Sequence, residues 1–128
     1  NSAVTTVNRV IDVFPSDQQE QVRVQLSFVL QAVIAQQLLP TANGNGRALA
    51  CEILVMTPAM RNLIREAQVD QLYSHLQMGK GEGMRTMNQS LADLVLSGKV
   101  SESEARYASP DLKELNRLLK EGVPTGVM

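Results

Sequence analysis

Two arginines four positions apart, Arg61 and Arg65, are the residues whose type and spacing best suit a chemical role. They lie in the segment 57–66, where Thr57 can cap a helix and Pro58 suits its first position, because proline lacks the N–H that would be unpaired there. On a helix both guanidinium groups share one edge, where like charges repel by about 0.2–0.5 kcal/mol. The pattern therefore predicts a basic edge that binds something anionic; a pair that is merely solvated is the alternative.

The rest of this predicted helix divides into two faces. The polar face holds both arginines together with Asn62 and Glu66, and the opposite face is apolar. The apolar side chains are Met60, Leu63, Ile64 and Ala67. We therefore expect a helix with one buried edge and one charged edge.

The other reactive residue types stand alone. His75 is the only histidine and Cys51 the only cysteine, so the sequence holds no histidine-based triad and no complete zinc site. His75 is expected to be exposed and without a role, and Cys51 to be a small buried side chain in an apolar strand. Glu52 in the same strand is expected to be buried, where its carboxylate needs an ion pair or a hydrogen bond; direct work at a nucleotide is the alternative.

Composition narrows the function classes. The 128 residues, 44% of them apolar, suffice for one domain with its own core, and a net charge of −1 argues against broad nucleic-acid binding. The single cysteine fits a reducing compartment, and the sequence as it stands shows neither a membrane-spanning apolar run nor a signal peptide. We therefore expect a cytoplasmic protein. Because it starts at Asn1 and enters helical periodicity at once, we expect it to be part of a longer chain.

Hydrophobic periodicity predicts the elements that position these residues. A helix capped by Ser2 runs to Pro15, and a capping box at Ser16 and Gln19 opens a second helix whose apolar stripe continues to Leu38. These two helices fill most of the chain before the turn residues that follow Pro40.

The next elements are one strand and several helices. Residues 47–56 read as a strand with two apolar faces, which predicts a place inside a sheet. The glycine-rich connector 79–83 is expected to be mobile, and its residue order does not match a phosphate-binding loop. The helices expected after the basic one are a helix from Val69 to Gly79, one capped by Thr86 with Gln89, a short one opened by Ser101, and a last one opened by Ser109 with Leu112 facing inward.

The segment Ala59-Met60-Arg61-Asn62-Leu63-Ile64-Arg65-Glu66 resembles the Ala-Ile-Arg-Asn-Leu-Ile-Arg-Glu signature of the twitching-motility ATPases, the PilT-type motors that retract type IV pili. Met60 is the single departure, and it nearly conserves volume. Asn1, Ser2 and Ala3 resemble the end of that family's histidine box, whose histidine and threonine would lie just before residue 1. Residues 8–15 are similar to the stretch that follows the box; the family more often has Asp at position 8, and Asp12 matches. The likeness extends to about Gly122, and the lack of Cys-x-x-Cys pairs favours the retraction branch over the assembly and secretion ATPases.

The resemblance implies an α/β, mostly helical fold. Residues 1–56 would be the downstream part of a RecA-like P-loop ATPase core, with two helices and a strand pair. Residues 57–122 would be a helical C-terminal subdomain carrying the retraction motif, and 123–128 a flexible tail. The family's phosphate loop (Walker A), acidic strand (Walker B) and catalytic Glu would all precede Asn1. No catalytic or metal-binding residue is therefore expected here, and the segment alone is expected to be inactive.

The resemblance also implies cofactors and partners. ATP and Mg²⁺ would be bound by the full-length protein and not by this segment alone. The family works as a homo-hexamer at the inner-membrane base of the pilus, on the cytoplasmic side, where it contacts the pilus platform and couples ATP hydrolysis to pilin removal. Its arginine-containing signature is linked to retraction rather than to nucleotide contact.

Two other classes stay open at this point. A stand-alone helical interaction module could use the Arg61 and Arg65 edge to bind an acidic protein partner without any enzymatic activity. A helix-turn-helix nucleic-acid binder over residues 86–121 is a third reading, against which the mixed charge and the 3% aromatic content argue.

Overall fold

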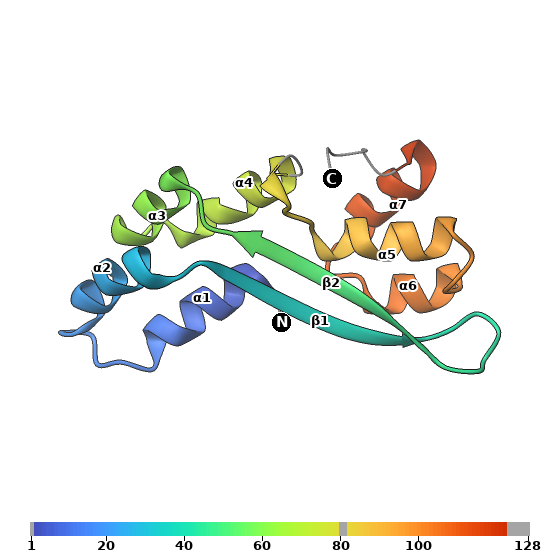
Figure 1. Ribbon diagram of the computed structural model, residues 1–128, viewed down its shortest axis with the longest axis horizontal. Coiled ribbons are helices and arrows are strands. Elements are labelled where there is room, and N and C mark those ends of the chain that lie inside the picture. Colours follow the sequence, from blue (N-terminus) through green and yellow to red (C-terminus); the bar gives the residue numbers. More distant parts are fainter. Residues whose placement is uncertain (1, 80–81, 123–128) are drawn as a thin grey trace.

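A β-hairpin runs along the long axis of the molecule and carries two groups of helices, as Figure 1 shows. This computed structural model describes residues 2–79 and 82–122. The strands β1 (Ala32–Pro40) and β2 (Arg47–Val55) pair antiparallel. One helical group consists of α1 (Ala3–Asp12), α2 (Gln19–Val29), α3 (Pro58–Arg65), the 3-10 helix η1 (Val69–Gln71) and α4 (Leu72–Met78). The other consists of α5 (Met87–Leu96), α6 (Glu102–Ala108) and α7 (Leu112–Glu121).

The predicted class, a mostly helical α/β chain with one strand pair, is confirmed within the described residues. Some of the expected features cannot be placed. Asn1, the predicted tail 123–128, and Lys80 and Gly81 of the predicted connector lie outside the residues that the structure describes.

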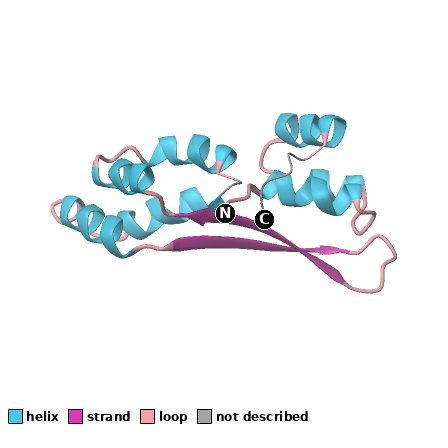
Figure 2. Cartoon of the chain, turned by 45° about the horizontal axis from the view of Figure 1, so that its top comes forward, coloured by secondary structure: helices cyan, strands magenta, loops and turns pink. Residues whose placement is uncertain are grey.

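The two helical groups lie toward opposite ends of the hairpin (Figure 2). Each encloses an apolar core. The deepest side chains of the first core are Leu54, Met60, Ile64, Leu72 and Leu76. Those of the second core are Ala50, Leu91, Ala105, Leu115 and Leu118. Because both cores use β2, the hairpin is the element that fixes the two helical groups to one another.

The two faces of the hairpin differ in exposure. Alternate residues within 48–54 are buried beneath the helices, while Leu49 on the outer face is 48% exposed and its cross-strand partner Leu38 is 65% exposed. Along the described chain β2 has β1 on one side and a single bridge, from Ile53 to Arg85, on the other. The prediction of a strand inside a sheet with both faces buried is therefore wrong here, because apolar outer residues alone do not require a covering layer.

The second helix is shorter than the sequence predicts. α2 ends at Val29, and the helix expected to reach Leu38 gives way to β1. A four-residue step, such as Ile34 to Leu38, keeps side chains on one face of a helix and also on one face of a strand. Periodicity could not separate the two, and antiparallel pairing with β2 along the whole of β1 decides for the strand.

The start of α2 is also displaced. The capping box predicted at Ser16 and Gln19 does not form, because α2 begins at Gln19 and Gln18 occupies the cap position without a side-chain hydrogen bond. The Nε2 of Gln19 instead donates to the carbonyl of Phe14 at 3.0 Å. This hydrogen bond spans the turn between α1 and α2.

The start of the last helix shifts in the same way. Asp111, rather than Ser109, caps α7, and its Oδ1 accepts the main-chain N–H of Lys113 at 3.1 Å. Leu112 then falls in the first turn and is 49% exposed instead of facing inward. Aspartate and serine cap helices about equally well. The Ser109 hydroxyl is engaged elsewhere, since it donates to Oδ1 of Asn88 at 2.6 Å and accepts the Asp111 N–H at 3.1 Å.

Four other predicted caps are confirmed. In each case the side-chain oxygen accepts a main-chain N–H three residues later, which satisfies one unpaired donor of the first turn. The pairs are Ser2 with Thr5, Thr57 with Met60, Thr86 with Gln89, and Ser101 with Glu104. Local polar spacing therefore predicted most helix starts correctly.

Ala67 ends α3 in a left-handed backbone conformation. Its φ is 59°, the main-chain N–H of Gln68 donates to the Leu63 carbonyl at 2.8 Å, and its own N–H donates to Ile64 at 3.3 Å. This hydrogen-bond pattern is the Schellman ending, whose left-handed position favours glycine. The expectation that Ala67 lies on the buried face is wrong, because the helix has already ended and the residue is exposed.

We predict that Ala67→Gly raises the free energy of unfolding by about 0.5–1 kcal/mol, because glycine adopts this φ without a Cβ penalty. Ala59→Gly is the matched control, since Ala59 is exposed on the same helix; it should lower the value by a similar amount. Urea denaturation of both variants measures the change. A loss of stability in Ala67→Gly would contradict the prediction.

Candidate functional site

Arg61 binds the C-terminal end of α2. Its Nη1 donates to the main-chain carbonyls of Ser27 at 2.8 Å and Leu30 at 2.9 Å, and lies 3.4 Å from that of Phe28. The last carbonyls of a helix lack partners within it and form the negative end of its dipole, so a cation there is favourable. The anionic partner expected from the sequence is thus, among the described residues, the end of a neighbouring helix rather than a carboxylate.

Arg65 reaches the same helix one turn further along α3. Its Nη1 donates to Oγ of Ser27 at 3.3 Å, its Nη2 donates to Oδ1 of Asn62 at 3.4 Å, and its guanidinium carbon lies 5.6 Å from the centroid of the Phe28 ring. Both arginines are half-buried, whereas Asn62 and Glu66 are exposed. The contacts of Arg65 are longer than those of Arg61, so Arg65 is the freer of the two to change partners.

The contact between α2 and α3, which we call the α2–α3 junction, closes the open end of the hairpin. α2 leads into β1, α3 follows β2, and the main-chain N–H of Met56 donates to the Gln31 carbonyl at 3.0 Å. Met60, Leu63 and Ile64 anchor α3 in the first core with at most 8% exposure. A displacement of α2 against α3 must therefore move the ends of both strands.

Glu52 lies in the interior on β2 and is 1% exposed. Its Oε1 accepts the main-chain N–H of Ala3 at 2.8 Å, and its Oε2 accepts that of Met87 at 3.1 Å. These are the first residues of α1 and α5, where helix dipoles are positive, so one carboxylate holds a helix start from each group. Hydrogen bonds, rather than an ion pair, satisfy Glu52 within the described part of the chain.

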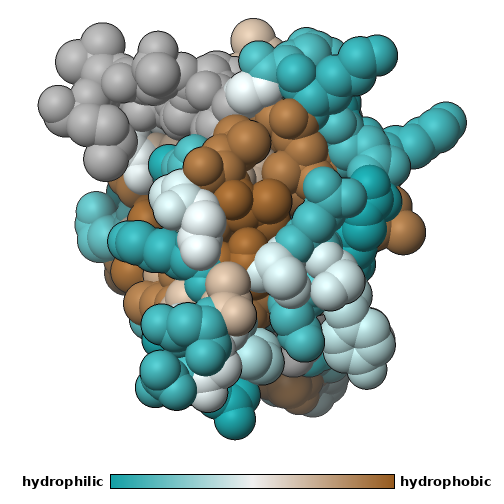
Figure 3. Space-filling model, turned by 90° about the vertical axis from the view of Figure 1, so that its right-hand side faces the viewer, coloured by the Kyte–Doolittle hydropathy of each residue, from teal (hydrophilic) through white to brown (hydrophobic). Residues whose placement is uncertain are grey.

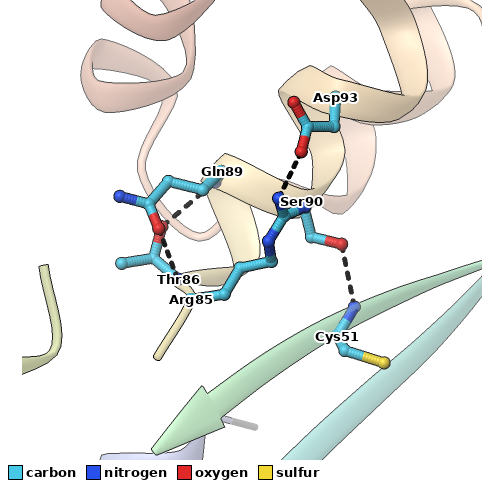
Figure 4. Close-up of polar contacts among 6 residues, drawn as sticks. All are labelled: Cys51, Arg85, Thr86, Gln89, Ser90 and Asp93. Atoms are coloured by element: carbon cyan, nitrogen blue, oxygen red, sulfur yellow. Dashed lines mark hydrogen bonds and ion pairs between the residues drawn. The ribbon is translucent and has the colours of Figure 1, made fainter. Parts of the chain in front are cut away.

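Further polar contacts fix the start of α5 to β2 (Figure 4). Thr86 and Gln89 form a reciprocal capping box with both distances at 3.0 Å. Oγ of Ser90 accepts the main-chain N–H of Cys51 at 3.0 Å. Cys51 itself is half-buried on the outer face of the hairpin, so the expectation of a fully buried thiol is wrong.

Arg85 adds a second connection between the segment before α5 and β2. Its main chain exchanges two hydrogen bonds with Ile53, at 2.8 and 3.0 Å. Its side chain forms an ion pair with Asp93 on α5, which Figure 4 also shows. Together with Glu52, these contacts hold α5 rigidly against the strand.

Glu114 is a buried carboxylate that sequence reasoning missed, because the charges around it read as a solvated face. It is 8% exposed and accepts hydrogen bonds from Tyr73 at 2.9 Å, Gln77 at 2.6 Å and Asn88 at 2.8 Å. Burial and the hydrogen bond to Glu114 raise the pKa of the Tyr73 phenol well above its ordinary value. The one available signal was the four-residue step to Leu118, which places Glu114 beside the apolar stripe of α7.

The remaining candidates form no catalytic constellation in the part of the chain that the structure describes. His75 is exposed on α4, as expected. No group of three or more His, Cys, Asp or Glu side chains among the described residues could hold a metal ion. No described helix has both the length and the apolar character needed to cross a membrane. The charged groups Glu52 and Arg61 instead bind the ends of helices.

Comparisons with known proteins identify the relatives of this chain. The twitching motility protein of Neisseria gonorrhoeae is 51% identical over 114 residues, and the type IV pilus retraction ATPase PilT of Pseudomonas aeruginosa is 48% identical over 105 residues. A crystal structure of the pilus retraction motor PilT with bound ADP matches 90% of this chain with a TM-score of 0.79 and 50% identity. The chain is homologous to one segment of the PilT-like pilus retraction ATPases.

This PilT-like segment spans about a third of the length of its relatives: 30% of both curated proteins and 32% of the crystallised chain. The ATPase DotB of Legionella pneumophila shares the fold with a TM-score of 0.67 at 18% identity. No protein-family model matches the chain. The assignment of residues 59–66 to a retraction motif, and of Asn1, Ser2 and Ala3 to the end of a histidine box, stays a prediction.

We predict that Arg61→Ala lowers the free energy of unfolding by about 1.5–3 kcal/mol, the range for hydrogen bonds made by charged groups. Arg65→Ala should cost about 0.5–1 kcal/mol, because its main contact is a partly exposed cation–π pair. Urea denaturation compares the two. Equal losses would show that Arg61 does not hold the end of α2 in the way its distances indicate.

Glu52→Gln should lower the free energy of unfolding by about 2 kcal/mol or more, because an amide has only one acceptor oxygen and its NH₂ group would face an N–H donor. Glu121→Gln, at an exposed position on α7, is the control and should change stability by less than about 0.5 kcal/mol. Thermal or urea unfolding gives both values, and a neutral Glu52→Gln would refute the role of the carboxylate at the two helix starts.

Proposed function

We propose that this chain is part of a hexameric ATPase motor that drives type IV pilus retraction, and that the α2–α3 junction relays its motion. The position of the motif residues 59–66 carries the proposal, since Arg61 among them contacts three main-chain carbonyls at the end of a second helix. The likeness to twitching-motility proteins supports the motor class.

The junction suits a relay because its contacts can change without unfolding the core. Met60 and Ile64 keep α3 anchored in the first core, while the arginines contact α2 only through polar and ring interactions. Two arrangements of α2 against α3 would therefore differ in a few charge-assisted hydrogen bonds, which is the kind of differential interaction that a conformational switch requires. Because α2 precedes β1 and α3 follows β2, such a switch would move the hairpin as a unit.

Motion is proposed to enter through α1. Ser2, which caps this helix, and Ala3, which begins it, are proposed to end the histidine box, and the Ala3 N–H donates to Glu52. Glu52 also accepts the Met87 N–H of α5, so a shift of α1 would displace the start of α5 in the second helical group. This route uses a rigid, fully buried link rather than a flexible one.

Cofactors and partners of the full-length protein follow from the same proposal. ATP and Mg²⁺ are assigned to residues outside this chain, because the described residues contain no cluster of metal ligands and residues 79–83 do not have the order of a phosphate loop. The segment alone is proposed to be inactive. The ring is a homo-hexamer on the cytoplasmic side of the inner membrane, contacts the pilus platform and binds no nucleic acid. Residues 1–56 belong to a RecA-like core, and 57–122 to a helical subdomain.

A second candidate function, a non-enzymatic interaction module, is favoured by one observation. Phe28 and Val29 are 65% and 69% exposed beside Arg65, which together offer an apolar and basic surface to an acidic partner. An absence of ATP hydrolysis in the purified full-length protein would favour this module over the motor.

The motor proposal predicts a separation of activities in the full-length protein. Arg65→Ala should leave ATP hydrolysis within about two-fold but reduce pilus retraction at least ten-fold, because it removes a relay contact and no nucleotide contact. Arg117→Ala, at an exposed position on α7, is the control and should retract normally. Circular dichroism verifies folding, and an Arg65→Ala variant that hydrolyses ATP and retracts at full speed would overturn the relay.

A further inference from the structure

Two surfaces of opposite charge lie at opposite ends of the long axis (Figure 1). One is a hollow beside the hairpin loop, which we call the hairpin hollow. The other is the turn between α1 and α2, residues 12–20, which we call the acidic corner. They cannot meet within one molecule, because the hairpin separates them.

The hairpin hollow has a volume of about 730 Å³. Ala48, Leu49 and Leu94 contribute apolar lining, and Arg47 and Lys99 supply two cations. Figure 3 views this end of the molecule, where hydrophobic and hydrophilic side chains lie next to one another. The hollow is thus suited to a partner that carries an apolar side chain next to carboxylates.

The cations of the hollow are available. Within residues 2–79 and 82–122, neither the Arg47 guanidinium nor the Lys99 ammonium has a hydrogen bond or an ion pair, and both residues are exposed. The main-chain carbonyl of Lys99 accepts the N–H of Ala42 at 2.8 Å, which ties the hairpin loop to the end of α5. This hydrogen bond joins two of the segments that line the hollow.

The acidic corner has the matching chemistry. Asp12, Asp17 and Glu20 give it a charge of −3, with no Lys or Arg inside residues 12–20; Arg9 and Arg23 lie outside this stretch. Between the carboxylates Val13 is 77% exposed and Phe14 is 39% exposed. A hollow lined by apolar and basic side chains suits exposed apolar side chains that lie close to carboxylates in the sequence.

We propose that the acidic corner of one copy of this chain docks in the hairpin hollow of the next copy. Because the two surfaces are different and lie at opposite ends, the contact is head-to-tail, and repetition closes a ring if the rotation between copies is right. The inference specifies how copies meet and so rests on the proposed homo-hexamer. It assigns Arg47 and Lys99 as the basic half of that contact and Asp17 and Glu20 as the acidic half.

Charge reversal and charge exchange in the full-length protein test this contact. Arg47→Glu with Lys99→Glu, or Asp17→Lys with Glu20→Lys, should each weaken self-association at least ten-fold in low salt, measured by sedimentation velocity. A protein carrying all four substitutions should recover to within about three-fold of the unmodified protein, which a folding defect would not do. Arg117→Glu with Lys120→Glu on α7 makes the same charge change at exposed positions and should not weaken association.

The outcomes separate this contact from the motor proposal. Unchanged association in either two-site variant, or no recovery in the four-site protein, overturns the contact while leaving the ring intact. A full-length protein that stays monomeric overturns the contact and the ring together. Recovery in the four-site protein supports the contact even if Arg65→Ala retains normal retraction, since the two experiments alter different ends of the molecule.

Discussion

Both helical groups depend on the carboxylate of Glu52. It is almost fully buried on β2 and receives the main-chain N–H groups of Ala3 and Met87, which begin one helix of each group. Glu52 has no ion pair among the described residues. The two positive helix ends make its burial tolerable, since each oxygen accepts a charge-assisted hydrogen bond. Without the Glu52 carboxylate, the starts of α1 and α5 would lose the acceptor that they share.

Arg61 is the electrostatic counterpart of Glu52. The carboxylate satisfies the positive starts of two helices, and the guanidinium satisfies the negative end of a third through the carbonyls of Ser27 and Leu30. The two groups differ in burial, since Glu52 lies in the interior while Arg61 is half-buried. The contacts of Glu52 are thus suited to rigidity and those of Arg61 to rearrangement. This difference fits a protein proposed to relay motion.

The sequence predicted local features better than long-range ones. The caps at Thr57 and Thr86 depend on residues three positions apart, so spacing alone revealed them. β1 was mistaken for helix because its pairing partner lies across the turn, and no local pattern distinguishes the two when apolar residues fall four apart. At the candidate site, the sequence predicted the basic edge of α3 but not its partner, the C-terminal end of α2. Glu114 was missed because its donors come from α4 and α5.

The contacts that attach α5 to the hairpin also block the free edge of β2. Its second edge would otherwise present unpaired main-chain groups to any extended peptide. The Cys51 N–H is taken by a serine hydroxyl, and the Ile53 N–H and carbonyl are taken by Arg85. At residues 51–53 these main-chain groups are not available to a further strand, which disfavours edge-to-edge aggregation at that part of the strand.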